Sequence, residues 1–161
     1  MIYVVTTLSG KELEAAALLR KEWYEAYVPR ATRRVRKGKD CYYTAEVMFD
    51  GYVFVSIDGE LTDEDYYKIK SIKLIGNFLS RRAALSEEEA EYVRALCNNG
   101  QNVGVSSGYV KGGKLYITDG WLKQFEDKIV RWSVRQHKAT AELTLHGEPH
   151  RITCTVDIEK A

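Results

Sequence analysis

The stretch MFDGYVFVSI, residues 48–57, decides the fold of the first half of the chain. From Gly51 onward the side chains alternate between the two sides of an extended strand. One side carries Val53, Val55 and Ile57, and the other carries Tyr52, Phe54 and Ser56. A core needs only one apolar side. The second side, with its two aromatic rings, must therefore be covered by more of this chain or by another molecule.

The segment before this strand predicts another strand followed by a helix. Residues 2–7, IYVVTT, are β-branched and aromatic and predict the strand. Ser9 and Glu12 have the spacing of a capping box, in which each side chain binds a free backbone N–H group at the start of a helix. The helix is expected to end ahead of Pro29. Its packed stripe is predicted to be Ala16, Leu19, Trp23 and Ala26.

A basic hairpin is expected between that helix and the opening stretch. Residues 30–39, RATRRVRKGK, hold six basic side chains in ten positions. The sequence KGKD at residues 37–40 is typical of a hairpin tip, and residues 41–49 then return as a strand. Together with the strands on either side, the hairpin predicts an antiparallel meander.

Two further helix starts follow the opening stretch. Thr62 and Ser86 are each followed by acidic residues, which suit the positive end of a helix dipole. The second of these helices carries its apolar stripe on Ala90, Val93, Leu96 and Cys97. Between the two helices, IKLIGNFLS predicts a strand or a strand-like turn.

The last third of the chain has a different composition. Residues 98–113 are rich in glycine and asparagine and are interpreted as a linker or domain boundary. The helix signal ends there, and short β runs follow, separated by turns. Residues 138–145 alternate cleanly, and so do residues 150–156. Several short strands in such a small region suggest a small closed barrel, because closure removes exposed edges.

Composition excludes several classes of function. The chain has 161 residues, 45% of them apolar, and a formal net charge of +1. No apolar run approaches the roughly 18 residues of a membrane span, and the N-terminus lacks the basic flank of a signal peptide. Three widely spaced cysteines, Cys41, Cys97 and Cys154, fit buried thiols in a reducing cytoplasm rather than a disulfide framework. We therefore expect a cytoplasmic protein.

The motif search gives no sign of catalysis, a metal or a cofactor. Sequence motifs for phosphate binding, serine hydrolases and zinc proteases are absent, and helix capping explains the clustered carboxylates. His146 and His150 are four residues apart, but Gly147 and Pro149 place them in a turn, where they cannot share the face of a helix. The expectation is a binding protein that needs no cofactor.

Two motifs resemble the NusG family of transcription elongation factors. The family pattern of two aromatics, Pro, Gly, Tyr and an apolar run is matched by Phe49-Asp50-Gly51-Tyr52-Val53-Phe54-Val55, with Asp50 in place of the proline. GGKLYITDGWLKQFEDKIVRW resembles the family's KOW motif. The matching positions are Gly113, Ile117, Asp119, Gly120, Leu122, Glu126 and Ile129, and the departures are Trp121, Gln124 and Asp127.

The resemblance covers nearly the whole chain and implies both fold and partners. It implies an α+β protein with a four-stranded antiparallel sheet flanked by about three helices, followed by a small five-stranded β-barrel. The expected domains are a polymerase-binding domain at residues 1–97, a linker at residues 98–107 and a KOW barrel at residues 108–161. The expected protein is a monomer that binds RNA polymerase and favours processive elongation.

The barrel differs from that of housekeeping family members. Those members carry a Phe-Gly-Arg loop near the end of the barrel, and this chain has Leu145-His146-Gly147-Glu148-Pro149 there. The shorter form is similar to specialised paralogs of the LoaP group, antiterminators whose barrel binds an RNA hairpin. The alternative is a general factor whose barrel recruits only proteins, either Rho or a ribosomal protein.

Three sets of residues are candidates for binding. The polymerase-binding set is Tyr3, Phe49, Gly51, Tyr52 and Phe54, with Tyr3 expected on the same face from the neighbouring strand. The pattern alone favours a second core layer, whereas the resemblance favours docking for Phe49 and Tyr52 and leaves both interpretations open for Tyr3 and Phe54. The set for DNA near the transcription bubble is Arg33, Arg34, Arg36, Lys37, Lys70 and Ser71, for which a charged edge that resists aggregation is the alternative.

The third set lies in the barrel and would contact a nascent RNA hairpin, because bases stack on aromatic rings and guanidinium planes. Its members are Trp121, Lys123, Gln124, Lys128, Arg131, Arg135, His137, Lys138 and Arg151. A solvated surface with Trp121 folded over the end of the barrel is the alternative.

Overall fold

The computed structural model describes residues 1–97 and 103–159. Its internal contacts divide the chain into two compact units. The first contains Met1–Pro29 and Phe49–Gly100, and the second contains Arg30–Met48 and Gln101–Ala161. The basic hairpin therefore groups with the C-terminal part of the chain. Of the predicted linker, residues 98–102 lie outside the described residues, and the domain boundaries stay a prediction.

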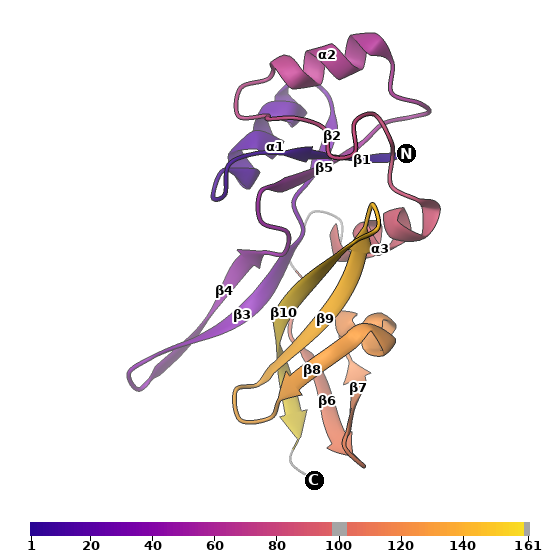
Figure 1. Cartoon of the computed structure of the whole chain (residues 1–161). Coiled ribbons are helices and arrows are strands. Elements are labelled where there is room, and N and C mark those ends of the chain that lie inside the picture. The colour runs from indigo at the N-terminus through magenta and orange to yellow at the C-terminus, as the bar shows by residue number, and fades with distance from the viewer. Residues whose placement is uncertain (98–102, 160–161) are drawn as a thin grey trace. The chain divides into compact units, whose positions relative to one another are not determined.

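The first unit is built on a three-stranded antiparallel sheet in the order β1-β5-β2. The strands are β1 (Ile2–Thr6), β2 (Glu25–Tyr27) and β5 (Tyr52–Ser56). The helices are α1 (Glu12–Lys21), α2 (Asp63–Ser71) and α3 (Glu87–Cys97), and α2 and α3 lie on opposite sides of the sheet (Figure 1). Alternation along β5 decides which side chains meet which helix.

One face of this sheet forms the core of the unit. Val53 and Val55 are fully buried there together with Leu19 of α1 and Ile69 of α2. Each of these four fully buried aliphatic side chains contributes roughly 1.5–3 kcal/mol relative to an exposed position. The predicted division of β5 into two faces is confirmed.

The predicted four-stranded sheet is wrong in its count. The segment expected as a strand or a strand-like turn contributes a single bridge, between Val5 and Phe78, and is therefore the strand-like turn of the two alternatives. Its backbone follows β1 through hydrogen bonds such as Leu79 N–H to the Val4 carbonyl (2.8 Å). Leu74 and Ser80 both have positive φ, which turns the chain away before a ladder can extend.

Two of the three predicted helix starts are confirmed, and the first is not. Thr62 accepts a hydrogen bond from the Asp65 N–H (3.1 Å), and Ser86 and Glu89 form the reciprocal capping box. Ser9 instead donates to Asp50, and Lys11 occupies the N-cap position of α1 without a side-chain hydrogen bond that caps the helix. A partner 41 residues away has displaced the local capping interaction.

The predicted stripe of α1 is only half right. Ala16 and Leu19 are buried as expected, but the helix ends at Lys21. Trp23 has a left-handed backbone (φ 69°) and is 93% exposed, and Ala26 is buried as part of β2. The sharp turn after α1 therefore breaks the helical periodicity that the stripe assumed.

The second unit contains a curled five-stranded sheet in the order β7-β6-β10-β9-β8. The strands are β6 (Ser106–Lys111), β7 (Lys114–Asp119), β8 (Ile129–Ser133), β9 (Lys138–Leu145) and β10 (Glu148–Glu159). The 3-10 segment η2 (Trp121–Lys128) connects β7 to β8. Five strands are confirmed, but the described β7 and β8 do not pair, so the sheet is a half-barrel and not the closed barrel expected.

The alternation that predicted this core is confirmed. Ala139, Ala141 and Leu143 are buried on one face of β9, and β10 buries Ile152, Cys154 and Val156 against them. The strand β6 was not predicted as one, because its residues include part of the expected linker. Gly108 is needed in it: a Cβ at this position would stand 2.3 Å from the Tyr116 carbonyl oxygen.

The basic hairpin is a separate two-stranded sheet within the second unit. It consists of β3 (Arg30–Lys37) and β4 (Asp40–Val47), and its tip is at the predicted KGKD turn. The Arg34 N–H donates to Thr155 Oγ1 of β10 (2.9 Å), and Thr32 N–H donates to the Val103 carbonyl (3.0 Å). These bonds occupy the free edge of β3, so the hairpin is held along the half-barrel and is not a free arm.

The three cysteines are free thiols in two different settings. Cys97 and Cys154 are buried, and burial raises the pKa of each thiol to about 12. Cys41 is exposed on β4 and accepts a hydrogen bond from Arg34 Nε (2.8 Å), so its predicted burial is wrong. No helix in the described residues is long and apolar enough to cross a membrane. Within residues 1–97 and 103–159, no three potential ligands gather to hold a metal ion.

Candidate docking surfaces

The second face of the three-stranded sheet carries the aromatic residues of the opening stretch. We call it the aromatic sheet face and define it by Phe49, Tyr52, Phe54 and Ser56. Phe54 is fully buried and meets Phe49 edge-on, with ring centroids 5.4 Å apart, and Phe49 is only 3% exposed. Tyr52 and Ser56 are half-buried. The centre of this face is therefore covered, and its two ends are accessible.

Two of the predicted polymerase-binding residues, Tyr3 and Gly51, have structural roles in the first unit. Tyr3 pairs with Val55, so it lies on the core face, and the prediction that it shares a face with Tyr52 is wrong. Its hydroxyl accepts a hydrogen bond from the Leu61 N–H (3.0 Å), which ties a loop to the core. Gly51 allows the turn into β5, with φ 76° and only 3.1 Å between an added Cβ and the Thr7 carbonyl oxygen.

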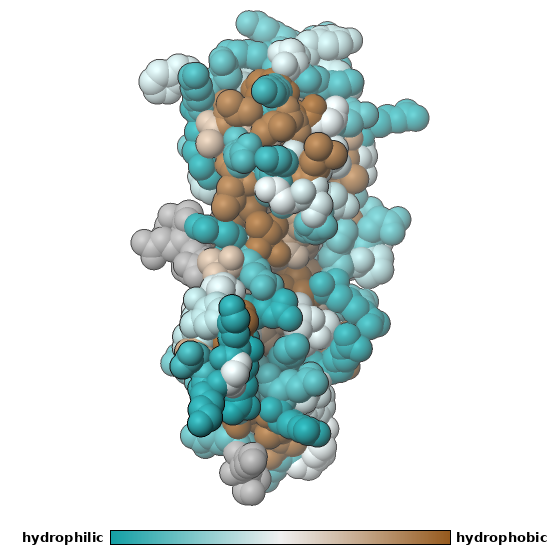
Figure 2. Space-filling model, turned by 90° about the vertical axis from the view of Figure 1, so that its left-hand side faces the viewer, coloured by the Kyte–Doolittle hydropathy of each residue, from teal (hydrophilic) through white to brown (hydrophobic). Residues whose placement is uncertain are grey.

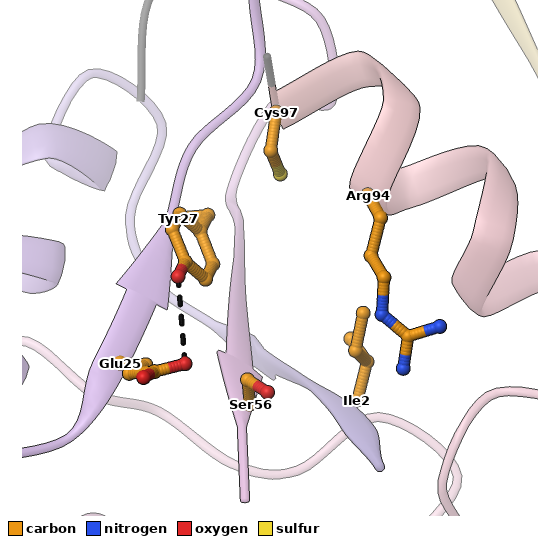
Figure 3. A pocket seen from close by; sticks show the side chains of 6 residues that line it. All are labelled: Ile2, Glu25, Tyr27, Ser56, Arg94 and Cys97. Atoms are coloured by element: carbon orange, nitrogen blue, oxygen red, sulfur yellow. Dashed lines mark hydrogen bonds between the residues drawn. The ribbon is translucent and has the colours of Figure 1, made fainter. Parts of the chain in front are cut away.

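A pocket of about 320 Å³ opens at the Ser56 end of the aromatic sheet face (Figure 3). Ile2, Ser56 and Glu25 stand in one row across β1, β5 and β2, because each pairs with its neighbour in register. Arg94 and Cys97 extend from α3 toward this row, and Tyr27 completes the lining.

The pocket combines one cation with several polar groups. The Arg94 side chain has no hydrogen bond or ion pair within the described part of the chain. The Tyr27 hydroxyl donates a hydrogen bond to the Glu25 carboxylate (3.5 Å). The pKa of Tyr27 is raised, first because its hydroxyl is partly buried and second because the negative charge of Glu25 is close. Sequence reasoning missed all three residues. Arg94 lies three positions before the buried Cys97, at the edge of the apolar stripe of α3. That stripe was interpreted only as core, so a binding residue beside it was not considered.

The residues predicted to contact DNA fall into both units. Arg33, Arg34, Arg36 and Lys37 lie on β3 of the hairpin, whereas Lys70 and Ser71 belong to α2 of the first unit. Lys70 Nζ stands 5.2 Å from the centre of the Tyr66 ring, and Ser71 donates to the Lys68 carbonyl (2.7 Å). Tyr42 and Tyr43 are exposed on β4, beside the arginines of β3. These two tyrosines were not among the candidates selected from the sequence.

The residues predicted to contact RNA are spread over three parts of the half-barrel. Trp121, Lys123, Gln124 and Lys128 lie in η2, Arg135 and His137 in the turn after β8, and Arg151 on β10. Trp121 is half-buried and meets Phe125 edge-on, with ring centroids 5.9 Å apart. This position is compatible with the alternative in which Trp121 folds over the end of the barrel. Arg151 pairs with Glu142 (3.2 Å).

Two members of that set do converge, and a residue from the DNA set joins them. Arg131 of β8, Lys138 of β9 and Arg33 of β3 line one groove of about 550 Å³, which we call the basic groove. Its remaining lining is Trp132, Ser133, Gln136, Thr140 and Thr153. Hydrophilic residues prevail over the second unit on the face shown in Figure 2, whereas apolar residues are visible over the first.

One solved structure has a fold that agrees with this architecture. The chain is similar along 97% of its length to NusG of Thermotoga maritima, in a structure of its domain interaction, with 19% identity, 93% coverage of that chain and a TM-score of 0.56. A structure of an MjSpt4:Spt5 complex matches at 19% identity over 98% of this chain and 94% of that chain, with a TM-score of 0.36. No curated protein matches.

The family comparison is more direct. The model of the family described as transcription termination factor nusG matches residues 2–94, which is more than half of the chain. Its range contains the whole three-stranded sheet, the basic hairpin and most of α3. The chain belongs to the NusG family, whose members are transcription factors.

Proposed function

We propose that this protein is a specialised elongation factor that binds RNA polymerase through the aromatic sheet face and promotes antitermination. The observation that carries the proposal is the pocket beside Ser56, at one end of the aromatic sheet face. There Arg94, which has no hydrogen bond or ion pair among the described residues, lies beside the half-buried Tyr27. Aromatic and arginine side chains dominate the binding energy of protein interfaces. The set fits the end of a helical hairpin that has apolar and acidic side chains, which is the chemistry expected of the polymerase clamp helices.

The test is a binding assay between the full chain and a clamp-helix fragment of RNA polymerase. The variant is Tyr52→Ala with Arg94→Ala, since both side chains are accessible and the fold should survive. The matched control is Tyr67→Ala with Lys68→Ala on α2, which also removes one ring and one cation from exposed positions. We expect at least a tenfold loss of affinity for the first variant and little change for the control. Equal affinities would refute this surface.

We propose further that the half-barrel binds a nascent RNA hairpin. Its support is the convergence of Arg131 and Lys138, neither of which has an ion pair among the residues the structure describes. Mobility shift of a leader RNA hairpin against a scrambled RNA, at physiological salt, separates this activity from a half-barrel that recruits only Rho or a ribosomal protein. No preference for the hairpin would favour the protein-recruiting alternative.

A further inference from the structure

The basic groove takes its cations from two elements that are far apart in the sequence. Arg33 belongs to the hairpin and Arg131 and Lys138 to the half-barrel, about 100 positions later. The bond between the Arg34 N–H and Thr155 Oγ1 sets the register between the elements, because it fixes the residue next to Arg33. The groove is therefore formed by the packing of the hairpin against the half-barrel within the second unit.

The charges of the groove are available to a ligand to different degrees. Arg131 and Lys138 have no ion pair or side-chain hydrogen bond within residues 1–97 and 103–159. Arg33 donates to Glu46 (2.9 Å), and both side chains are nearly half exposed. An ion pair as exposed as this one is weak, so a phosphate can replace the carboxylate at small cost.

The spacing of the cations suits a chain of phosphates. Arg131 pairs with Thr140 and Ser133 pairs with Lys138, so Arg131 and Lys138 are diagonal neighbours on one sheet face. Diagonal neighbours stand about 7–8 Å apart, which allows the two side chains to reach successive phosphates of one strand. Arg33 then faces them from β3 across the groove.

The floor of the groove is neutral and can act as both hydrogen-bond donor and acceptor. The Thr140 and Thr153 hydroxyls share one hydrogen bond (3.0 Å), and the side-chain amide of Gln136 has no hydrogen bond in the described residues. Hydroxyl and amide groups can serve a 2′-hydroxyl, which is itself a donor and an acceptor and which distinguishes RNA from DNA.

We infer that the hairpin and the half-barrel together hold the sugar–phosphate backbone of one RNA strand in the basic groove. The inference rests on the proposed RNA binding and deepens it. It assigns Arg33 to RNA, and it makes the hairpin part of the RNA-binding surface. A continuation along β10 exists, because a second cavity that also contains Arg33 and Thr153 reaches Arg151.

The experiment measures binding of the full chain to a labelled RNA stem–loop with single-stranded flanks, and to DNA of the same sequence, at several salt concentrations. The variants are Arg131→Gln with Lys138→Gln, and Arg33→Gln alone. The control is Lys111→Gln with Lys114→Gln, which removes the same charge from exposed positions on β6 and β7. Arg33→Lys keeps the charge on the hairpin.

The salt dependence of affinity counts the phosphate contacts, at about 0.7 in the slope of log K against log salt for each contact to a single strand. We expect the slope to fall by about 1.4 in the double variant and by about 0.7 in Arg33→Gln. Arg33→Lys should keep the wild-type slope, and the control variant should keep both slope and affinity.

Each other outcome overturns a specific statement. If wild type binds the stem–loop but Arg33→Gln keeps the wild-type slope, the hairpin takes no part and the composite groove is wrong. If the control variant loses as much as the groove variant, binding is diffuse over the surface. Equal affinity for DNA refutes the role of the 2′-hydroxyl, and no binding by wild type refutes the RNA half of the proposed function itself.

Discussion

The aromatic sheet face and the basic groove differ in the kind of side chain that they offer to a partner. The sheet face buries its centre, with Phe54 fully covered, and exposes only its ends. The basic groove has an open centre, lined by two cations that have no partner among the described residues. Apolar contacts depend on area removed from water, whereas phosphate contacts depend on released counterions. One surface should therefore be sensitive to truncation and the other to salt.

The largest expected effect is on the stability of the first unit. Replacing Phe54 with Ala removes a fully buried ring and its edge-on contact with Phe49, and should cost about 3–5 kcal/mol of unfolding free energy. Tyr52→Ala, on the same face of the same strand, should cost clearly less because its side chain is half-buried. Urea denaturation measures both. Similar costs would mean that the accessible end of the sheet face is as much core as its centre.

The next effect separates the two surfaces by salt. With three or four phosphate contacts, affinity for a single RNA strand should fall roughly 20- to 50-fold between 50 and 200 mM salt. Affinity for the clamp-helix fragment should change only a few-fold, because one cation and several apolar groups carry it. Titrations of the same preparation with both ligands give the comparison. Parallel salt curves would show that the sheet face also binds mainly by charge.

The smallest effect concerns pH and the second unit. Burial lowers the pKa of His150, and Glu148 opposes the shift only in part. The unfolded chain then takes up its proton first as pH falls below about 6.5, so stability decreases toward acid pH and is fully restored above that value. Urea midpoints at pH 5.5 and 7.5 test this in wild type and His150→Gln. A difference that is unchanged in the variant would assign the pH dependence to other groups.

Local signals were reliable where partners are close in sequence. The caps at Thr62 and Ser86 and the alternation of β9 all follow from residues within a few positions of one another. Ser9 has the same signature as Ser86, yet Asp50 binds it from a distant turn. Because the sequence does not say which residues meet across the fold, the failed cap could not have been distinguished from the successful one.

The candidate sites show the same division. The aromatic set was found from alternation in β5, but the face of Tyr3 depends on the register between two strands, and a shift of one residue reverses it. Arg131 and Lys138 were recognised as basic residues of the half-barrel. Their meeting with Arg33 depends on where the edge of β3 pairs, which no local pattern encodes.

The second unit is discontinuous along the chain. The backbone passes between the units at Pro29–Arg30, at Met48–Phe49 and again between Cys97 and Val103. A fragment made by cutting only at the last of these junctions would therefore keep five strands of the half-barrel and lose both strands of the hairpin. Such a truncation would appear to isolate a domain while removing one wall of its groove, so the natural unit for dissection is a circularly permuted or full-length chain.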